Sequence, residues 1–430
     1  MRIAYITAGA ASMYCGSCMH DNTLVMALRR LGHDAMLIPT YTPIRTDEPD
    51  ASQPRVFFGG INVFLQQKLS LFRHTPRFFD RLLDAPGLLR WAGRFAGKTR
   101  AEELGGLTVS MLKGERGHQR KEVLQIAEWL ADEARPDIIV LSNVLISGMI
   151  HEIGRRINAP VLCTLQGDDI FLESLPQAAR EQALALIRVH GRDIQGYITT
   201  SSFYADFMSG YLGIERDRLH VVYPGLNLDG YDGVPAGRRE PPFTIGYFAR
   251  ICPEKGLHNL AEAYRILRKQ PGAPPCRLRL GGWLGEHNKT YLQNTLKHLA
   301  DAGLADEVEY VDCPDHKSKV EFLKSLDIFS VPTTYREPKG LYVLEAWANG
   351  VPVVQPRHGS FPELIEATGG GELCHVDDPH DLARALGELL QNPERRLELG
   401  KRGHAGVRRH FHAERMARET AAVFERYANR

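Results

Sequence analysis

Two glutamates close together in the sequence carry the strongest chemical signal. They are Glu337 and Glu345, with seven residues between them in "IFSVPTTYREPKGLYVLEAWANGVPVV". The pattern predicts a strand that ends at Pro332, a loop through Glu337 and a helix from about Gly340 to Asn349, with Gly350 as its cap. Glu337 is therefore expected at the carboxyl end of a strand, and Glu345 inside the following helix.

Glu345 lies among apolar residues of the predicted helix. A carboxylate is costly to bury there without a partner. Either it pairs with an arginine or a backbone amide for structural reasons, or its oxygens accept hydrogen bonds from a vicinal diol such as a nucleotide ribose. The amides that follow "EPKG" lie at a helix N-terminus and would face an anion.

Two cations follow an earlier strand in the same half of the chain. In "FTIGYFARICPEKGLHNL" a predicted strand runs into Arg250, and Lys255 comes just before a helix. A guanidinium fork and an ammonium at such a turn can neutralise a diphosphate. Alone this is a weak signal, but together with the two glutamates it indicates a nucleotide-diphosphate site.

A pair of cysteines near the N-terminus admits three interpretations. In "ASMYCGSCMHDN", Cys15 and Cys18 form a C-x-x-C pair, with His20 two places further on. Zinc needs about four ligands, and no second C-x-x-C or histidine pair completes a site, so no metal is expected. A reactive thiol at a helix N-terminus and a glycine loop around Gly16 that approaches a ligand closely remain as alternatives.

Strand-like and helix-like segments alternate along the whole chain. Runs such as "RIAYIT", "AMLIPT", "DIIVLS" and "APVLCTL" are separated by helical sequence, and a second series begins at "FTIGYFAR". Alternation of this kind predicts parallel sheets with helices on both faces. A segment rich in glycine and proline, residues 230–242, separates the two series. We therefore expect two doubly wound α/β domains, at residues 1–232 and 243–412, facing a central cleft, and a C-terminal helix at 413–430 that packs back on the first.

Residues 66–100 do not follow this alternation of strand-like and helix-like segments. They contain eight lysines and arginines against two aspartates, interleaved with aromatic and aliphatic residues. A basic amphipathic stretch can lie on an anionic membrane surface. The alternative is an inserted helical pair with a solvated basic face.

Composition excludes several classes of protein. The 430 residues are 43% hydrophobic and 24% charged with a net charge of +1, so nothing indicates a nucleic-acid partner. The seven cysteines suit reduced thiols better than a disulfide framework. With no apolar run long enough to span a bilayer, a cytoplasmic protein is expected, with peripheral contact at the inner face of the membrane if residues 66–100 bind lipid.

The motifs together resemble the retaining glycosyltransferases of family 4, the group of glycogen synthases and mannosyltransferases with the two-domain GT-B fold. The resemblance is carried by "ARICPEKG", "EPKGLYVLEAWANGVPVV" and "GSFPELI" in the second half. In the first half it is carried by the glycine loop, "RRLGHDAMLI" and "RLHVVYPGLNLDGY". It covers nearly the whole chain except about residues 50–120.

The resemblance implies roles for particular residues. Arg250 and Lys255 would hold the donor diphosphate, Glu345 the ribose, and Glu337 the transferred sugar and the charge that develops on it. Further donor contacts would come from Gly16, Lys339, Gly340 and Leu341. The family needs no metal, retains anomeric configuration, and uses the departing phosphate to help deprotonate the acceptor.

One position departs from the family pattern. Where many members carry a histidine, this chain has Gln166 in "APVLCTLQGDDIFL". Glutamine can bind a sugar hydroxyl but cannot take a proton. Asp168 or Asp169 could then serve as the acceptor base, with Asp169 also a candidate acceptor contact, or both acids cap the next helix.

Two other functions remain open at this point. A nucleotide-sugar epimerase on the same fold would use the donor without an acceptor. A non-catalytic pseudo-glycosyltransferase would only bind partners, although the set of Arg250, Lys255, Glu337 and Glu345 argues against it.

Overall fold

The chain forms two compact units in the computed structural model. Residues 1–9, 15–54, 56–57, 101–231 and 240–428 are described. Unit 1 comprises Met1–Tyr223 and Glu414–Arg430, and unit 2 comprises Pro224–Ala413. The division falls between Tyr223 and Pro224, ahead of the segment rich in glycine and proline. The basic stretch 66–100 lies outside the described residues, so both interpretations of it stay predictions.

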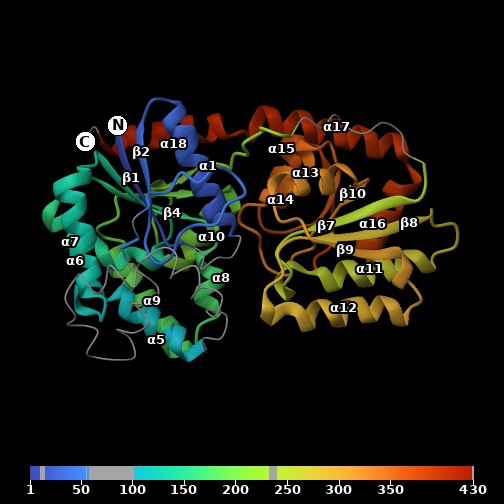
Figure 1. Ribbon diagram of the computed structural model, residues 1–430, viewed down its shortest axis with the longest axis horizontal. Coiled ribbons are helices and arrows are strands. Elements are labelled where there is room, and N and C mark those ends of the chain that lie inside the picture. Colours follow the sequence, from blue (N-terminus) through green and yellow to red (C-terminus); the bar gives the residue numbers. More distant parts are fainter. Residues whose placement is uncertain (10–14, 55, 58–100, 232–239, 429–430) are drawn as a thin grey trace. The chain divides into compact units, whose positions relative to one another are not determined.

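Unit 1 is built on a six-stranded parallel sheet with the order β2-β1-β3-β4-β5-β6 (Figure 1). Its strands are β1 (Arg2–Thr7), β2 (Asp34–Pro39), β3 (Ile138–Leu141), β4 (Val161–Leu165), β5 (Gly196–Thr199) and β6 (Leu219–Val221). All residues of β3, β4 and β5 are buried, as expected of strands covered on both faces.

Helices cover this sheet and complete its core. They are α1 (Gly16–Arg30), α5 (Ala101–Leu112), α6 (Arg120–Trp129), α7 (Ile150–Arg156), α8 (Asp168–Glu173), α9 (Gln177–His190) and α10 (Ser202–Leu212). Leu24 and Leu28 of α1 are buried. Ser201 caps α10 by accepting a hydrogen bond from the Tyr204 amide.

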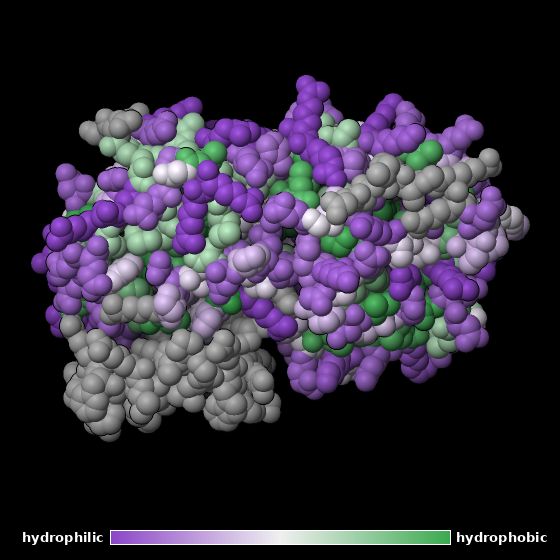
Figure 2. Space-filling model, turned by 45° about the horizontal axis from the view of Figure 1, so that its top comes forward, coloured by the Kyte–Doolittle hydropathy of each residue, from purple (hydrophilic) through white to green (hydrophobic). Residues whose placement is uncertain are grey.

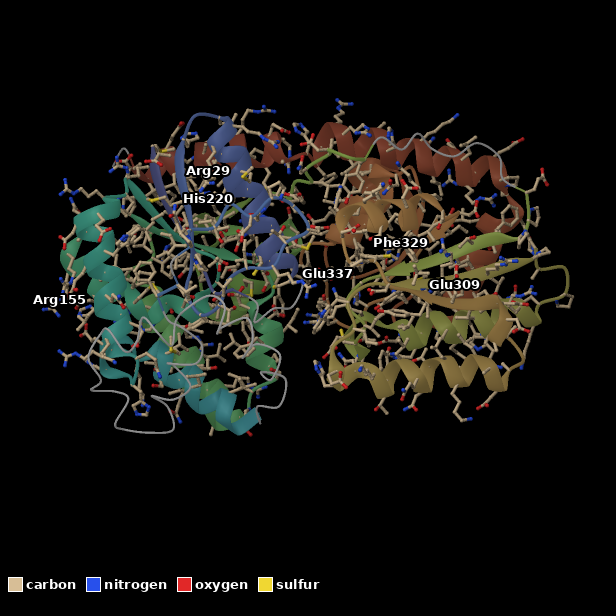
Figure 3. All side chains as sticks on the ribbon, in the orientation of Figure 1. Arg29, Arg155, His220, Glu309, Phe329 and Glu337 are labelled. Carbon is tan, nitrogen blue, oxygen red and sulfur yellow. The ribbon has the colours of Figure 1, made fainter. Side chains whose placement is uncertain are left out.

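The last helix, α18 (Ala413–Ala428), returns to unit 1. The Tyr427 hydroxyl lies 2.8 Å from His220 Nε2 on β6, and the two rings meet edge to face. Arg415 donates to the Tyr223 carbonyl at 2.6 Å. Unit 1 is therefore made from two separate stretches of sequence. His220 is labelled in Figure 3.

Unit 2 has a second six-stranded parallel sheet, ordered β12-β11-β10-β7-β8-β9. Its strands are β7 (Phe243–Phe248), β8 (Cys276–Gly281), β9 (Val308–Val311), β10 (Ile328–Phe329), β11 (Val353–Pro356) and β12 (Gly371–Cys374). Ile245 of β7 stands opposite Leu278 of β8 and Ile328 of β10, all three fully buried. The two doubly wound parallel sheets predicted from the sequence are confirmed.

The helices of unit 2 lie on both sides of its sheet (Figure 1). They are α11 (Leu257–Lys269), α12 (Lys289–Asp301), α13 (His316–Lys324), α14 (Leu341–Ala348), α15 (Phe361–Thr368), α16 (Pro379–Gln391) and α17 (Pro393–His410). Helices α11 and α16 pack together, and α17 packs on α14 and α15. Trp347 of α14 is fully buried and donates to the Gly370 carbonyl at 2.8 Å.

The visible surface in Figure 2 is mostly hydrophilic, with small separate hydrophobic areas. Among the described residues, no helix combines the length and apolar character needed to cross a bilayer.

Candidate functional site

The first part of the site is the loop between β10 and α14. Strand β10 ends at Phe329, and the chain continues through Glu337 to Gly340, which precedes the helix with φ of +67° (Figure 3). A left-handed conformation of this kind suits glycine, and it lets the chain turn abruptly into α14. The Glu337 carbonyl accepts the Ser360 amide at 2.8 Å, which fixes the loop against the start of α15.

The Glu337 carboxylate lies at the centre of this loop and accepts five hydrogen bonds. Its Oε1 accepts from the backbone amides of Lys339 and Gly340, both at 3.3 Å. Its Oε2 accepts from three side chains: Lys255 Nζ at 2.6 Å, Tyr335 Oη at 2.6 Å and Tyr342 Oη at 3.0 Å. Only 4% of Glu337 is exposed. A buried carboxylate with this many donors is held in one orientation.

Lys255 reaches Glu337 from the turn after β7. It ends the single-turn segment Pro253–Lys255, and its ammonium lies 4.9 Å from the ring centre of Tyr335 and 4.8 Å from that of Tyr342. Gly256 follows with φ of +69°, and a Cβ there would lie 1.7 Å from the Pro332 carbonyl oxygen. Glycine therefore lets the turn after β7 lie directly against the end of β10.

Electrostatics keep Glu337 ionised. Burial opposes the charge, but the charge of Lys255 and the hydrogen bonds from Lys255 and Tyr335 outweigh it and lower the pKa of Glu337 to about 2. The same burial, together with the neighbouring Glu337 charge, raises the pKa of Tyr335 and of Tyr342 well above the usual range. Both tyrosines therefore remain hydroxyl donors.

Glu345, on the second turn of α14, is the centre of a separate ion pair. Its Oε1 accepts from Lys319 Nζ of α13 at 2.5 Å and from Tyr231 Oη at 3.4 Å. Lys319 and Glu345 are each 5% exposed. The structural alternative had been an arginine or a backbone amide, and the partner is instead a lysine that sequence reasoning missed. Lys319 lies beside Val320 and Leu323 on the buried face of α13. Its position among these apolar residues was the feature of the sequence that could have identified it as the partner of Glu345.

The remaining unit 2 residues proposed for the donor lie along the same edge. Lys339 and Gly340 are buried, and Leu341 is partly exposed at the first position of α14. Arg250 is exposed two residues after β7. Burial and the charge of Glu337 raise the pKa of Tyr335, and the nearby positive charge of Arg250 opposes that rise. Because the strands are parallel, the turns after β7 and β10 meet at the carboxyl edge of the sheet, where ligands of such folds bind.

In unit 1 the residues after β4 are held by hydrogen bonds. Asp168 is 4% exposed, and its two oxygens accept the amides of Val144 and Gln166 at 2.8 and 3.0 Å. Burial raises the pKa of Asp168 to about 6, although these amides oppose the rise. Its carboxylate therefore joins the ends of β3 and β4, a role that neither the base nor the cap interpretation anticipated.

Asp169 and Gln166 have different neighbours. Asp169 is partly exposed and accepts the Tyr204 hydroxyl at 2.6 Å. Burial raises the pKa of Asp169, with the Tyr204 hydrogen bond opposing the rise. Gln166 is 4% exposed and donates to Asp21 Oδ1 at 2.9 Å and to the Ser142 carbonyl at 3.2 Å. Asp21, which sequence reasoning did not single out, is the centre of a buried network.

The C-x-x-C pair lies at the start of α1. Cys15 precedes the helix, Gly16 is its first residue and is exposed, and Cys18 is buried. All seven cysteines are free thiols. Within the described part of the chain, no group of three or more histidine, cysteine, aspartate or glutamate side chains is arranged to hold a metal ion.

Two doubly wound parallel sheets, each with polar side chains gathered at its carboxyl edge, define a chain of the GT-B class. Comparison with known families supports this. The family model "Glycosyl transferases group 1" matches residues 234–405, and "Glycosyl transferase 4-like domain" matches residues 22–225. Together the two matches extend over most of both units. The chain belongs to the family 4 type of GT-B glycosyltransferases, and the predicted family and enzyme class are confirmed.

Individual relatives are distant. D-inositol 3-phosphate glycosyltransferase of Pseudarthrobacter chlorophenolicus is 27% identical over 80% of this chain and 84% of its own length. Other curated relatives are matched over only 50–64% of their length. Sucrose-phosphate synthase from Thermosynechococcus elongatus has a TM-score of 0.70 at 18% identity, over 99% of this chain and 98% of that one. HepE of Anabaena in complex with UDP-glucose has a TM-score of 0.65 at 15% identity, each chain 99% covered. These two structures share the fold.

Proposed function

We propose that the protein transfers a sugar from a nucleoside diphosphate sugar to a hydroxyl acceptor, with retention of anomeric configuration. The observation that carries the proposal is the group of Lys255, Glu337 and Glu345 at the carboxyl edge of the unit 2 sheet. It combines a cation suited to a diphosphate with two fixed carboxylates suited to hydroxyl groups. Family membership supports the same reaction class.

In this proposal Lys255 and Arg250 neutralise the diphosphate that leaves. Lys255 must then exchange Glu337 for a phosphate oxygen. Glu337 would keep its other four donors, namely two tyrosine hydroxyls and two amides, so no buried charge is left without hydrogen bonds. The exchange therefore costs far less than breaking an isolated buried ion pair. The cations stabilise negative charge where it develops in the transition state.

The two glutamates would bind different hydroxyl groups. Glu345 would accept a ribose hydroxyl through the oxygen not taken by Lys319, and Glu337 would face the transferred sugar and its oxocarbenium character. The amides of Lys339, Gly340 and Leu341, at the start of α14, would donate to the phosphate and the sugar. A UDP-sugar is the first donor to test, because HepE is described in complex with UDP-glucose.

Unit 1 would supply the acceptor contacts. Gln166 and Asp169 lie after β4, at the carboxyl edge of that sheet. Gly16, which opens α1 after β1, keeps the role predicted for it, a contact to the donor. Asp168 is unsuited to the base role first predicted for it, because both its oxygens already accept amides. No metal or cofactor is needed for this scheme, since lysine and arginine carry the positive charge.

Calorimetry of nucleotide binding tests the donor assignment. UDP, GDP and ADP are titrated into the wild type, Glu345→Ala and the control Glu372→Ala, which removes a partly exposed glutamate from β12. We expect one nucleotide to bind wild type and control alike and to bind Glu345→Ala at least tenfold more weakly. Equal affinity for all three proteins would refute the ribose role.

Turnover distinguishes the proposed reaction from its rivals. Lys255→Ala should lower sugar transfer at least 100-fold, the effect of about 3 kcal/mol of lost electrostatic stabilisation. An epimerase would convert the sugar while leaving its bond to the diphosphate intact, so no nucleoside diphosphate would be released. A pseudo-glycosyltransferase would bind nucleotide without any turnover. Near-normal activity of Lys255→Ala would rule out the role of that lysine.

A further inference from the structure

The Tyr335 hydroxyl lies between the ammonium of Lys255 and the carboxylate of Glu337, which is labelled in Figure 3. It accepts a hydrogen bond from Lys255 Nζ at 2.5 Å and donates one to Glu337 Oε2 at 2.6 Å. A hydroxyl can do both because it has one hydrogen to donate and two lone pairs to accept with. Lys255 also donates directly to Glu337 Oε2 at 2.6 Å. The two charged groups are therefore joined by one direct connection and by a second one through Tyr335.

Tyr342 belongs to the same cluster but has a different connection to the lysine. Its hydroxyl donates to Glu337 Oε2 at 3.0 Å, and among the described residues it has no hydrogen bond to Lys255. Its ring centre lies 4.8 Å from Lys255 Nζ, against 4.9 Å for the ring of Tyr335. An aromatic ring at such a distance attracts an ammonium. Both tyrosines therefore hold Lys255 through their rings, but only Tyr335 also holds it through a hydroxyl.

The three N–H groups of Lys255 determine how it can respond to a ligand. One donates to Tyr335 and one to Glu337, and 12% of the lysine side chain is exposed. A diphosphate that takes over the bond now made to Glu337 would draw the ammonium away from that carboxylate. The bond to the Tyr335 hydroxyl can persist through this exchange, because it uses a different N–H group.

We infer that Tyr335 is a positioning residue for the diphosphate of the donor. Its hydroxyl keeps Lys255 beside Glu337 while the ammonium turns to a phosphate oxygen, and it acts through the lysine without contacting the phosphate itself. The inference rests on the proposed sugar transfer, in which Lys255 binds the diphosphate. It involves residues of unit 2 alone. Only hydrogen bonds change in this step, and every proton stays on the atom that carries it.

Loss of the Tyr335 hydroxyl should make the exchange less favourable for two reasons. Glu337 would lose one of its five donors and would hold Lys255 more strongly. Lys255 would lose the acceptor that stays with it as it turns to the phosphate. Tyr335→Phe keeps the aromatic ring and its attraction for the ammonium, so this variant isolates the effect of the hydroxyl.

Calorimetry with a nucleoside and its diphosphate measures this effect. Uridine and UDP are titrated into each protein, with guanosine and GDP, and adenosine and ADP, in parallel. The ratio of the two dissociation constants reports the contribution of the diphosphate. We expect Tyr335→Phe to lower this ratio at least tenfold, while uridine affinity stays within twofold of wild type. Tyr342→Phe should lower it by at most threefold, because its hydroxyl has no hydrogen bond to Lys255.

Tyr264→Phe is the matched control. Tyr264 is also a buried tyrosine whose hydroxyl lies near a glutamate, at 2.7 Å from Glu307 Oε2. The same hydroxyl lies 2.8 Å from the carbonyl of Cys276, the first residue of β8, and so at the opposite edge of the sheet. The ratio for this control should stay within twofold of wild type.

The Lys255→Ala background tests whether Tyr335 acts through that lysine. Without the ammonium, Tyr335 has nothing to position, so adding Tyr335→Phe should change the ratio less than twofold. The effects of the two substitutions should therefore be far from additive, as expected of residues that act as one unit.

Several results would overturn the inference. A Tyr335→Phe ratio within threefold of wild type excludes the positioning role. An equal fall in the ratio with and without Lys255 shows that Tyr335 does not act through the lysine. Loss of uridine binding together with UDP binding assigns Tyr335 a role in folding alone. A wild type that binds none of the three diphosphates better than its nucleoside refutes the proposed function itself, whatever the tyrosine does.

Discussion

Replacing Glu337 by glutamine should change the stability of unit 2 in a way that depends on pH. The pKa of Glu337 is about 2 in the folded chain against 4.5 for an ordinary glutamate, because Lys255 and the tyrosines outweigh the effect of burial. The difference, 4.5 − 2 = 2.5, corresponds to about 3 kcal/mol of folding free energy at neutral pH. Since the folded pKa is the lower one, this stabilisation is complete above pH 4.5 and is lost as the pH falls towards 2.

Urea unfolding followed by tryptophan fluorescence measures this. Trp283 and Trp347 belong to unit 2, so a Trp91→Phe/Trp129→Phe background isolates its transition. At pH 7 we expect Glu337→Gln to lower the free energy of unfolding by about 3 kcal/mol more than it does at very low pH. At pH 3 this pH-dependent part of the destabilisation should be about 1 kcal/mol. Any cost of leaving Lys255 without a carboxylate adds equally at both pH values.

The change between pH 7 and pH 3, about 2 kcal/mol, is therefore the diagnostic quantity. Glu372→Gln, at a partly exposed position of β12, should show no such change. If the deficit of Glu337→Gln were the same at both pH values, the ionised carboxylate would not be the source of the stabilisation.

Three further predictions concern other parts of the two units. Lys319→Met should destabilise unit 2 by about 3–5 kcal/mol in urea, because it leaves Glu345 buried without its cation, and adding Glu345→Gln should recover most of the loss. A double variant no more stable than the single one would disprove this. The pKa of Asp168 is raised by burial to about 6, so unit 1 should gain stability as the pH falls from 6 towards 4, and Asp168→Asn should remove that slope from thermal unfolding curves. Gly256→Ala should weaken nucleotide binding at least tenfold in calorimetry, because its Cβ would displace the Pro332 carbonyl, whereas Gly272→Ala, with the same sign of φ and open space around it, should bind normally.

The sequence was informative wherever function follows from position along a strand. Parallel strands bring their carboxyl ends to one edge, so residues such as Arg250, Lys255 and Glu337 could be placed together from strand endings alone. Lys255 and Glu337 indeed lie 2.6 Å apart. The two sheets could be predicted because their buried strands alternate regularly with amphipathic helices.

The partners of the charged residues could not be predicted in the same way. The pairing of Glu345 with Lys319 joins α14 to α13, and only the packing of these helices determines it. The hydroxyl donors Tyr335 and Tyr342 looked like ordinary aromatic residues of a loop and a helix. Asp168 was assigned a chemical role from its residue type. Its two oxygens instead accept hydrogen bonds from two backbone amides, whose positions depend on turns that sequence patterns do not describe.

The return of α18 to unit 1 has a consequence for synthesis on the ribosome. Unit 2 is encoded by one uninterrupted stretch, whereas unit 1 needs residues after 413, including Tyr427 against β6. The N-terminal part of a chain usually folds first as it emerges. Here unit 2 can finish first, and the nascent unit 1 lacks the contact of Tyr427 with His220 of β6 until its last helix is synthesised. A chain stalled before residue 414 would therefore expose the part of unit 1 that α18 contacts to chaperones and proteases.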